Sequence, residues 1–213
     1  DVAWEAHAGG ALNVMTRPLD GSASPRLLRQ WGRGGGPADW SPDGRFLLYA
    51  SIDVTNGYNL WAVPFDQSVE PFPLVEDEFD DSEGQLSPDG RWLAYESTAS
   101  GRSEVYLQRL DGTGRVGGPH RVSRAGAGQP RWRGDSRELF FLGGSTVMAV
   151  DVHDDERVTG PPRELFAIGG LRPAGRSYAV TPDGQRFIAI VGSADAAPRP
   201  ATVMLNWQPA SRR

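Results

Sequence analysis

The sequence predicts an all-β protein built of repeated units, and a recurring turn and its spacing are the observations that predict it. A Pro-Asp-Gly turn followed by a strand-like apolar run begins at Pro42, Pro88 and Pro182, with a degenerate Gly-Asp-Ser copy at Gly134. The aspartates of the four copies lie 46, 46 and 48 residues apart. A period of about 40 to 50 residues is typical of four-stranded blades. The predicted fold is therefore a β-propeller with four-stranded antiparallel blades.

Each turn has residues suited to reversing the chain between the first and second strands of a blade. Proline fixes φ at the first corner, aspartate can bond its own backbone two residues on, and glycine accepts positive φ. In the strands after the turns, apolar residues fall on both faces, as at Trp92 and Leu93. We therefore expect each complete blade to lie between two others. The third copy departs from the pattern in its turn, and we expect its strand to be kept.

The remaining strands of each unit follow from runs of β-forming residues. Third strands are predicted at 58–63, 104–110 and 146–151. Fourth, outer strands are predicted at 72–76, 120–123 and 164–167. Asp20-Gly21 and Asp111-Gly112 are hairpin signals between third and fourth strands.

The two ends of the chain are expected to form incomplete units. Residues 2–6 match a second strand with no first strand before it, and three strands without a fourth are predicted at 177–180, 186–191 and 202–207. The predicted units are a partial blade at 1–36, blades at 37–81, 82–128 and 129–175, and a partial blade at 176–213. These make about four and a half blades of a larger ring. Further sequence, a homodimer through the open blade edges, or atypical terminal blades would cover those edges.

Composition argues against several classes of function. The net charge is −5, and we expect no nucleic-acid binding because that rests on a basic surface. Cysteine is absent, which excludes disulfides, thiolate metal sites and a cysteine nucleophile. No apolar run approaches the roughly 18 residues of a membrane span, so direct membrane insertion is not expected.

The strand Ser-Pro-Asp-Gly-Arg-Phe-Leu-Leu-Tyr at 41–49 and its copy at 87–95 resemble the TolB-like, WD-like propeller repeat. This resemblance covers essentially the whole chain. Segments 129–150 and 201–207 are similar to the propellers that follow bacterial eukaryotic-type serine/threonine protein kinases. The resemblance implies a sensor module of a larger bacterial signalling protein, which would lie outside the membrane.

The chain itself is not expected to be an enzyme. It lacks lysine and the kinase loop motifs, and it has no Gly-x-Ser-x-Gly elbow. His7, His120 and His153 occur singly, without a second ligand at metal-site spacing. We therefore predict no catalytic residue, no metal and no cofactor. The alternative is a gate or platform for a prolyl-oligopeptidase-like hydrolase whose catalytic domain lies outside this sequence.

Two features are candidates for binding. Trp31 precedes a glycine-rich segment at 32–36 and is a candidate for ligand contact, whereas most other tryptophans are expected to pack between blades. The second feature is an acidic run formed by Glu76, Asp77, Glu78, Asp80, Asp81 and Glu83. It is either a solvated loop, a docking patch for a basic partner, or a weak cation site. The leading hypothesis is a protein partner or small ligand at the loop-lined face or central channel.

Overall fold

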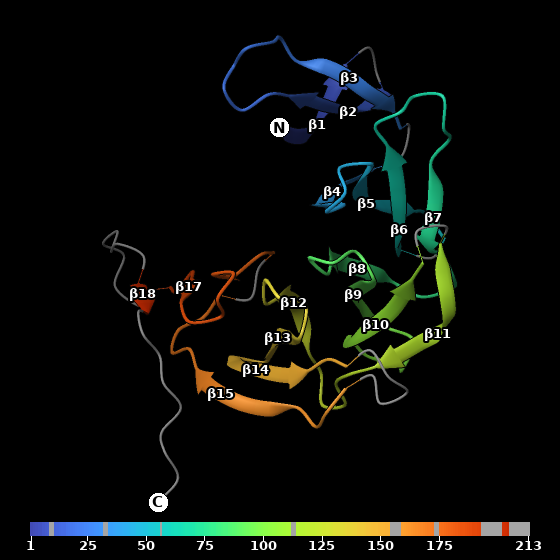
Figure 1. Cartoon of the computed structure of the whole chain (residues 1–213). Helices are drawn as coiled ribbons and strands as arrows, with labels where there is room; N and C mark the ends of the chain where they lie inside the picture. Colours follow the sequence, from blue (N-terminus) through green and yellow to red (C-terminus); the bar gives the residue numbers. More distant parts are fainter. Residues whose placement is uncertain are drawn as a thin grey trace, which may run out of the picture.

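In the residues that the structure describes, the chain forms strands and no helix. The computed structural model describes residues 1–8, 11–31, 34–55, 57–111, 114–153, 159–172, 175–192 and 202–204. These residues contain 18 strands in five antiparallel sheets, and each sheet has its strands in sequence order. Figure 1 shows the sheets following one another around an arc, with β4, β8 and β12 on its inner side and β7, β11 and β15 on its outer side. The predicted all-β fold class is confirmed, and the architecture is a partial β-propeller.

The sheets comprise three complete and two three-stranded units. The first sheet has β1 (Val2–Ala8), β2 (Ala11–Arg17) and β3 (Arg26–Gln30). The second has β4 (Gly35–Trp40), β5 (Phe46–Asp53), β6 (Gly57–Pro64) and β7 (Phe72–Val75). The third has β8 (Asp81–Leu86), β9 (Trp92–Ser97), β10 (Glu104–Leu110) and β11 (Arg115–Arg121). The fourth has β12 (Gly128–Trp132), β13 (Glu138–Gly143), β14 (Thr146–Asp151) and β15 (Arg163–Ala167). The fifth has β16 (Tyr178–Val180), β17 (Phe187–Ala189) and β18 (Thr202–Met204).

The predicted third strands are confirmed as β6, β10 and β14, and two of the predicted fourth strands as β7 and β15. The fourth strand predicted at 120–123 is wrong, because β11 begins five residues earlier, at Arg115. The first part of this strand was not predicted because residues 115–119 include two glycines and a proline, which are uncommon in strands. Proline is nevertheless tolerated on an edge strand. Residues 205–207 of the last predicted strand lie outside the described residues. The unit boundaries remain predictions.

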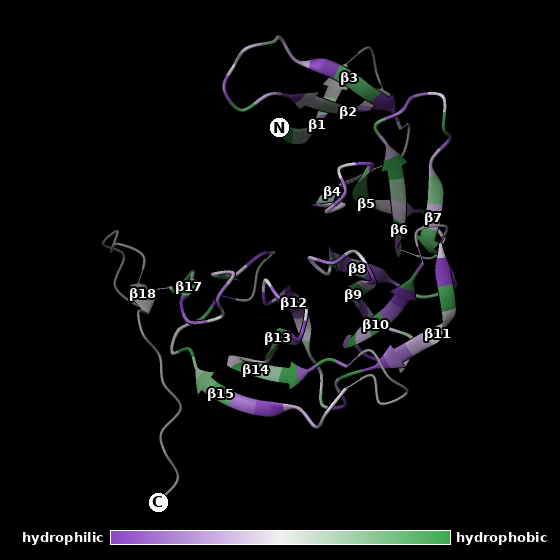
Figure 2. Cartoon of the chain, viewed as in Figure 1, coloured by the Kyte–Doolittle hydropathy of each residue, from purple (hydrophilic) through white to green (hydrophobic). Residues whose placement is uncertain are grey.

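The core lies between successive sheets, as the two-sided apolar pattern of the strands predicts. Neighbouring residues of one strand face different sheets: Leu47 packs toward the first sheet and Leu48 toward the third. Trp92 faces the fourth sheet, whereas Leu93 faces the second. Figure 2 shows both hydrophilic and hydrophobic residues on the outer strands β11 and β15, with β15 hydrophilic at its start and hydrophobic toward its end. In the described part of the chain, no helix could cross a membrane.

All four repeated turns have one geometry. Gly44, Gly90 and Gly184 have φ of 71°, 73° and 71°, and Ser136 takes the same conformation with φ of 62°. The N–H of each donates to the carbonyl oxygen three residues before, at 2.8 to 3.0 Å. The degenerate copy is therefore a turn of the same kind, in which a serine occupies a position that favours glycine.

The two residues of the third turn that differ from the pattern, Gly134 and Ser136, form hydrogen bonds to the neighbouring turns. The N–H of Gly134 donates to the carbonyl oxygen of Pro182 at 2.7 Å, a bond that proline at this position could not make. A Cβ on Gly134 would lie only 2.9 Å from that oxygen. The hydroxyl of Ser136 accepts a hydrogen bond from the N–H of Asp89 at 3.0 Å. The two substitutions therefore link this turn to the turns on both sides.

Candidate functional site

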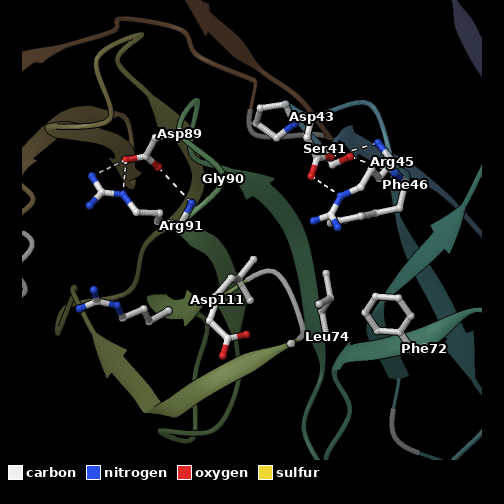
Figure 3. A pocket seen from close by; sticks show the side chains of 14 residues that line it. Ser41, Asp43, Arg45, Phe46, Phe72, Leu74, Asp89, Gly90, Arg91 and Asp111 are labelled. Carbon is white, nitrogen blue, oxygen red and sulfur yellow. Dashed lines mark hydrogen bonds and ion pairs between the residues drawn. The ribbon is translucent and has the colours of Figure 1, made fainter.

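A groove of about 470 Å³ lies between the second and third sheets, beside the repeated turns. Its apolar wall comes from Phe46, Phe72 and Leu74 of the second sheet and Leu110 of the third. Figure 3 shows the two turns opposite Phe72 and Leu74. The ring centroids of Phe46 and Phe72 are 6.3 Å apart in an edge-on arrangement. Phe72 and Leu74 of this wall lie on the outer strand β7.

The polar rim of the groove consists of two equivalent aspartate–arginine pairs, drawn in Figure 3. Arg45 binds Asp43, and the Nη2 atom of Arg91 lies 2.8 Å from Oδ2 of Asp89. Burial opposes ionisation of Asp89, but hydrogen bonds from Ser87 and Arg91 outweigh it and lower the pKa of the carboxyl. The rim charges therefore compensate one another and are held in fixed positions.

Arg109 also borders the groove, from β10. Its guanidinium carbon lies 5.6 Å from the centroid of the Trp92 ring, in a cation–π contact. Stacking on the indole limits the positions open to this long side chain. The groove thus combines an apolar wall with cationic groups already placed by their neighbours.

The structure divides the acidic run between exposed and buried positions. The side chains of Glu76, Asp77, Glu78 and Asp80 are exposed in the link between β7 and β8. Asp81 begins β8 and is fully buried, and Glu83 is half-buried within β8 with φ of 49°. The run therefore does not form one continuous surface, and its binding role remains a prediction.

The buried end of the run is fixed between two sheets. Asp80 accepts a hydrogen bond from the N–H of Tyr58 and donates its own N–H to Thr98, both at 3.0 Å. Neither carboxylate oxygen of Asp81 makes a hydrogen bond of ordinary geometry with the part of the chain that the structure describes. Burial raises the pKa of Asp81 to about 7; the Ser97 hydroxyl partly offsets this, whereas the charge of Asp77 adds to it. Across the described ranges, no three histidine, aspartate or glutamate side chains converge to hold a metal ion.

The other predicted site residue, Trp31, lies within an aromatic cluster. Its ring centroid is 5.3 Å from that of Tyr49 and 5.5 Å from that of Trp61. Its indole N–H donates to the hydroxyl of Ser51 at 2.9 Å. These contacts give the half-buried ring a packing role, like that expected of most other tryptophans. Ligand contact by Trp31 remains a prediction.

Sequence reasoning missed a series of polar residues on the inner strands. Asp39 on β4, Gln85 on β8 and Arg131 on β12 are spaced 46 residues apart, the same period as the turns. Their 46-residue spacing is the feature of the sequence from which they could have been predicted. Gln85 and Arg131 border a second cavity, also of about 470 Å³, next to β16 and β17.

Comparisons with known proteins bear on the fold. No family model matches the chain. It is 31% identical over 74 residues to Atu1656, an uncharacterized protein of Agrobacterium fabrum, which is 35% of this chain and 25% of that protein. TolB from Acinetobacter baumannii is 16% identical with a TM-score of 0.68, over 90% of this chain and 46% of TolB.

Two further structures are similar. A putative TolB from Agrobacterium tumefaciens is 21% identical with a TM-score of 0.59, over 77% of this chain and 60% of that one. A Mycobacterium tuberculosis puromycin-hydrolyzing peptidase is 19% identical with a TM-score of 0.61, over 91% of this chain and 36% of that one. The chain thus spans less than two thirds of each of these proteins. At such identities the likeness concerns the fold alone, and that fold is a TolB-like β-propeller.

Proposed function

We propose that this chain is a non-catalytic binding module of a larger bacterial signalling protein, such as a serine/threonine kinase. The observation that carries the proposal is the groove between the second and third sheets. It receives a small ligand or a segment of a protein partner. The likeness to TolB supports a propeller module, and the kinase association rests on the resemblance of segments 129–150 and 201–207.

The groove has the size and preorganisation that binding requires. Its volume of about 470 Å³ falls within the range of about 300 to 1,000 Å³ found for ligand sites. Phe46 and Phe72 offer apolar surface, and the paired rim side chains have little freedom left to lose when a ligand binds. An apolar group with a polar end fits this combination of wall and rim.

The exposed part of the acidic run is proposed as an auxiliary docking patch. Glu76, Asp77, Glu78 and Asp80 place four exposed carboxylates within five consecutive residues. A basic partner would be attracted to them, and this attraction would weaken as salt is added. Salt dependence of partner binding that disappears in a variant with these carboxylates neutralised would support the patch.

The groove is tested by selecting peptides that bind the full chain and then measuring their affinity for two matched variants. Phe72→Glu puts a charge into the groove wall, whereas Val54→Glu makes a similar change at a fully exposed turn residue outside the groove. We expect the selected peptides to lose at least about tenfold in affinity for Phe72→Glu only. Equal affinity for both variants, with Phe72→Glu still folded, would show that the groove is not the binding site.

A second candidate is the gate or substrate platform of a hydrolase. It is favoured by the peptidase from Mycobacterium tuberculosis, which aligns with 91% of this chain but only 36% of its own length. The gene that encodes this chain separates the two hypotheses. A Gly-x-Ser-x-Gly domain beside the propeller would favour the hydrolase, and a kinase domain followed by a membrane span would favour the signalling protein.

A further inference from the structure

The inner strands of successive sheets are joined by a repeated hydrogen bond from backbone to side chain. The Oδ2 atom of Asp39 on β4 accepts from the N–H of Leu86 on β8, at 2.8 Å. The Oε1 atom of Gln85 on β8 accepts from the N–H of Trp132 on β12, at 3.1 Å. Since Asp39 and Gln85 are equivalent in the repeat, this position calls for a side chain that can accept a hydrogen bond.

Arg131 occupies the next equivalent position and cannot make this link, because a guanidinium has donors only. The residue is 8% exposed. Its Nη1 atom donates to the carbonyl oxygen of Pro130 at 2.7 Å, and its guanidinium carbon lies 5.5 Å from the centroid of the Tyr178 ring. Its Nη2 atom is buried and has no hydrogen-bond partner among the described residues. Leaving a buried charged donor unpaired is costly, so an added hydrogen-bond acceptor would be favourable at this position.

The unpaired donor belongs to a residue that borders the second cavity, and a second arginine borders it as well. Arg176 lies just before β16, and its guanidinium donates to the carbonyl oxygen of Ala38 on β4. It therefore reaches from the fifth sheet to the second. Burial lowers the pKa of Arg131, and the positive charge of Arg176 lowers it further. Both cationic side chains therefore border one cavity.

The nearby acidic groups do not neutralise this pair directly. Asp39 and Glu83 favour the charged form of Arg131 through space, but neither forms an ion pair with it among the residues described. The carboxylate of Asp39 already accepts the N–H groups of Leu86 and Trp40. An anion entering the cavity would therefore meet two cationic side chains, Arg131 and Arg176, that border it.

We propose that the second cavity binds the carboxylate of a small ligand between Arg131 and Arg176. This inference rests on the proposed function as a binding module and specifies a ligand for it. Guanidinium groups recognise carboxylates through paired, charge-assisted hydrogen bonds. Ile188 and Ile190, which are 44% and 60% exposed, border the same cavity and suit an apolar group attached to that carboxylate.

The test is calorimetric titration of the full chain with N-acetyl-L-leucine, which carries a carboxylate, and with its uncharged amide. We expect saturable binding of the carboxylate and at least about tenfold weaker binding of the amide. Arg131→Gln restores the acceptor found at Gln85, so this variant should unfold at the same or a higher temperature while losing at least about tenfold in affinity. Arg176→Gln, at an exposed residue, should also weaken binding, and Arg26→Gln on β3 should not.

Several results would overturn the inference. They are no binding of the carboxylate up to about 10 mM, equal binding of acid and amide, or unchanged affinity in a folded Arg131→Gln variant. Inorganic phosphate that competes as strongly as the carboxylate would identify a general anion site instead. Peptide binding at the groove, measured on Arg131→Gln, separates the two proposals. If it persists while carboxylate binding is absent, only the present inference fails.

Discussion

Replacing Asp81 with asparagine should change how stability depends on pH. Asp81 is fully buried without ordinary hydrogen bonds, and burial raises its pKa from 3.8 to about 7. Because the folded pKa lies above the unfolded value, the folded state binds this proton more tightly. The contribution that protonated Asp81 makes to the stability of the folded state is therefore fully present below pH 3.8 and is lost as the pH rises through about 7.

The size of the effect follows from the two pKa values. Each pH unit between 3.8 and about 7 corresponds to about 1.4 kcal/mol, which gives an upper limit of about 4 kcal/mol at pH 8. Asparagine keeps the shape without the charge. The Asp81→Asn variant should therefore be within about 1 kcal/mol of wild type near pH 4, and more stable by up to about 4 kcal/mol at pH 8.

Urea unfolding of both proteins at the two pH values measures the difference, with Glu78→Gln as the matched change at an exposed residue of the same run. A stability difference that does not change with pH would refute the reasoning. The same unfolding measurement with added calcium chloride at pH 8 tests whether the acidic run binds a cation. Stabilisation of wild type but not of Asp81→Asn would favour the cation-site interpretation of the acidic run.

Three other predictions concern the turns, the aromatic cluster and the open flank. Gly134→Ala should destabilise the protein by about 1 to 3 kcal/mol in urea, because its Cβ would lie 2.9 Å from a carbonyl oxygen, whereas Gly118→Ala meets no atom within 4 Å and should cost less. Trp31→Phe and Ser51→Ala should each cost about 1 kcal/mol, and the double variant should cost less than the sum because both changes remove the same hydrogen bond; additive costs would contradict this. Light scattering should show a dimer near twice 23.1 kDa; a monomeric wild type at all concentrations would contradict association through the open flank.

Local chemistry allowed most of the fold to be predicted from the sequence. The turn residues around Asp43 and Asp89 act within a few positions of one another, so their pattern is visible without a structure. β11 was misplaced because Gly117, Gly118 and Pro119 are poor strand formers. The neighbouring strand β10 stabilises β11 there, since the side-chain amide of Gln108 donates to the carbonyl oxygen of Val116 at 3.1 Å. Such support comes from tertiary structure and leaves little trace in the local sequence.

The candidate sites were much less visible. In the sequence, Asp81 and Glu78 are two acidic residues of one run, with nothing to distinguish them. In the structure, Asp81 is buried at the start of β8, whereas Glu78 is exposed in the link before it. The groove is formed by residues of two sheets, such as Phe72 and Leu110, which approach each other only in the fold. Arg131 stands out once its neighbours on the inner strands are known to accept hydrogen bonds. Repeats thus predict architecture well, while binding depends on departures from the repeat that are recognised in three dimensions.

Hydrogen exchange of the full chain, with and without a selected peptide ligand, tests the proposed binding role most directly. It reports on every candidate surface in one measurement. The account predicts slower exchange at the backbone around the groove, in β7 and in the turns at 41–45 and 87–91. Protection confined to the acidic run at 76–83, or to β17 on the open flank, would contradict it.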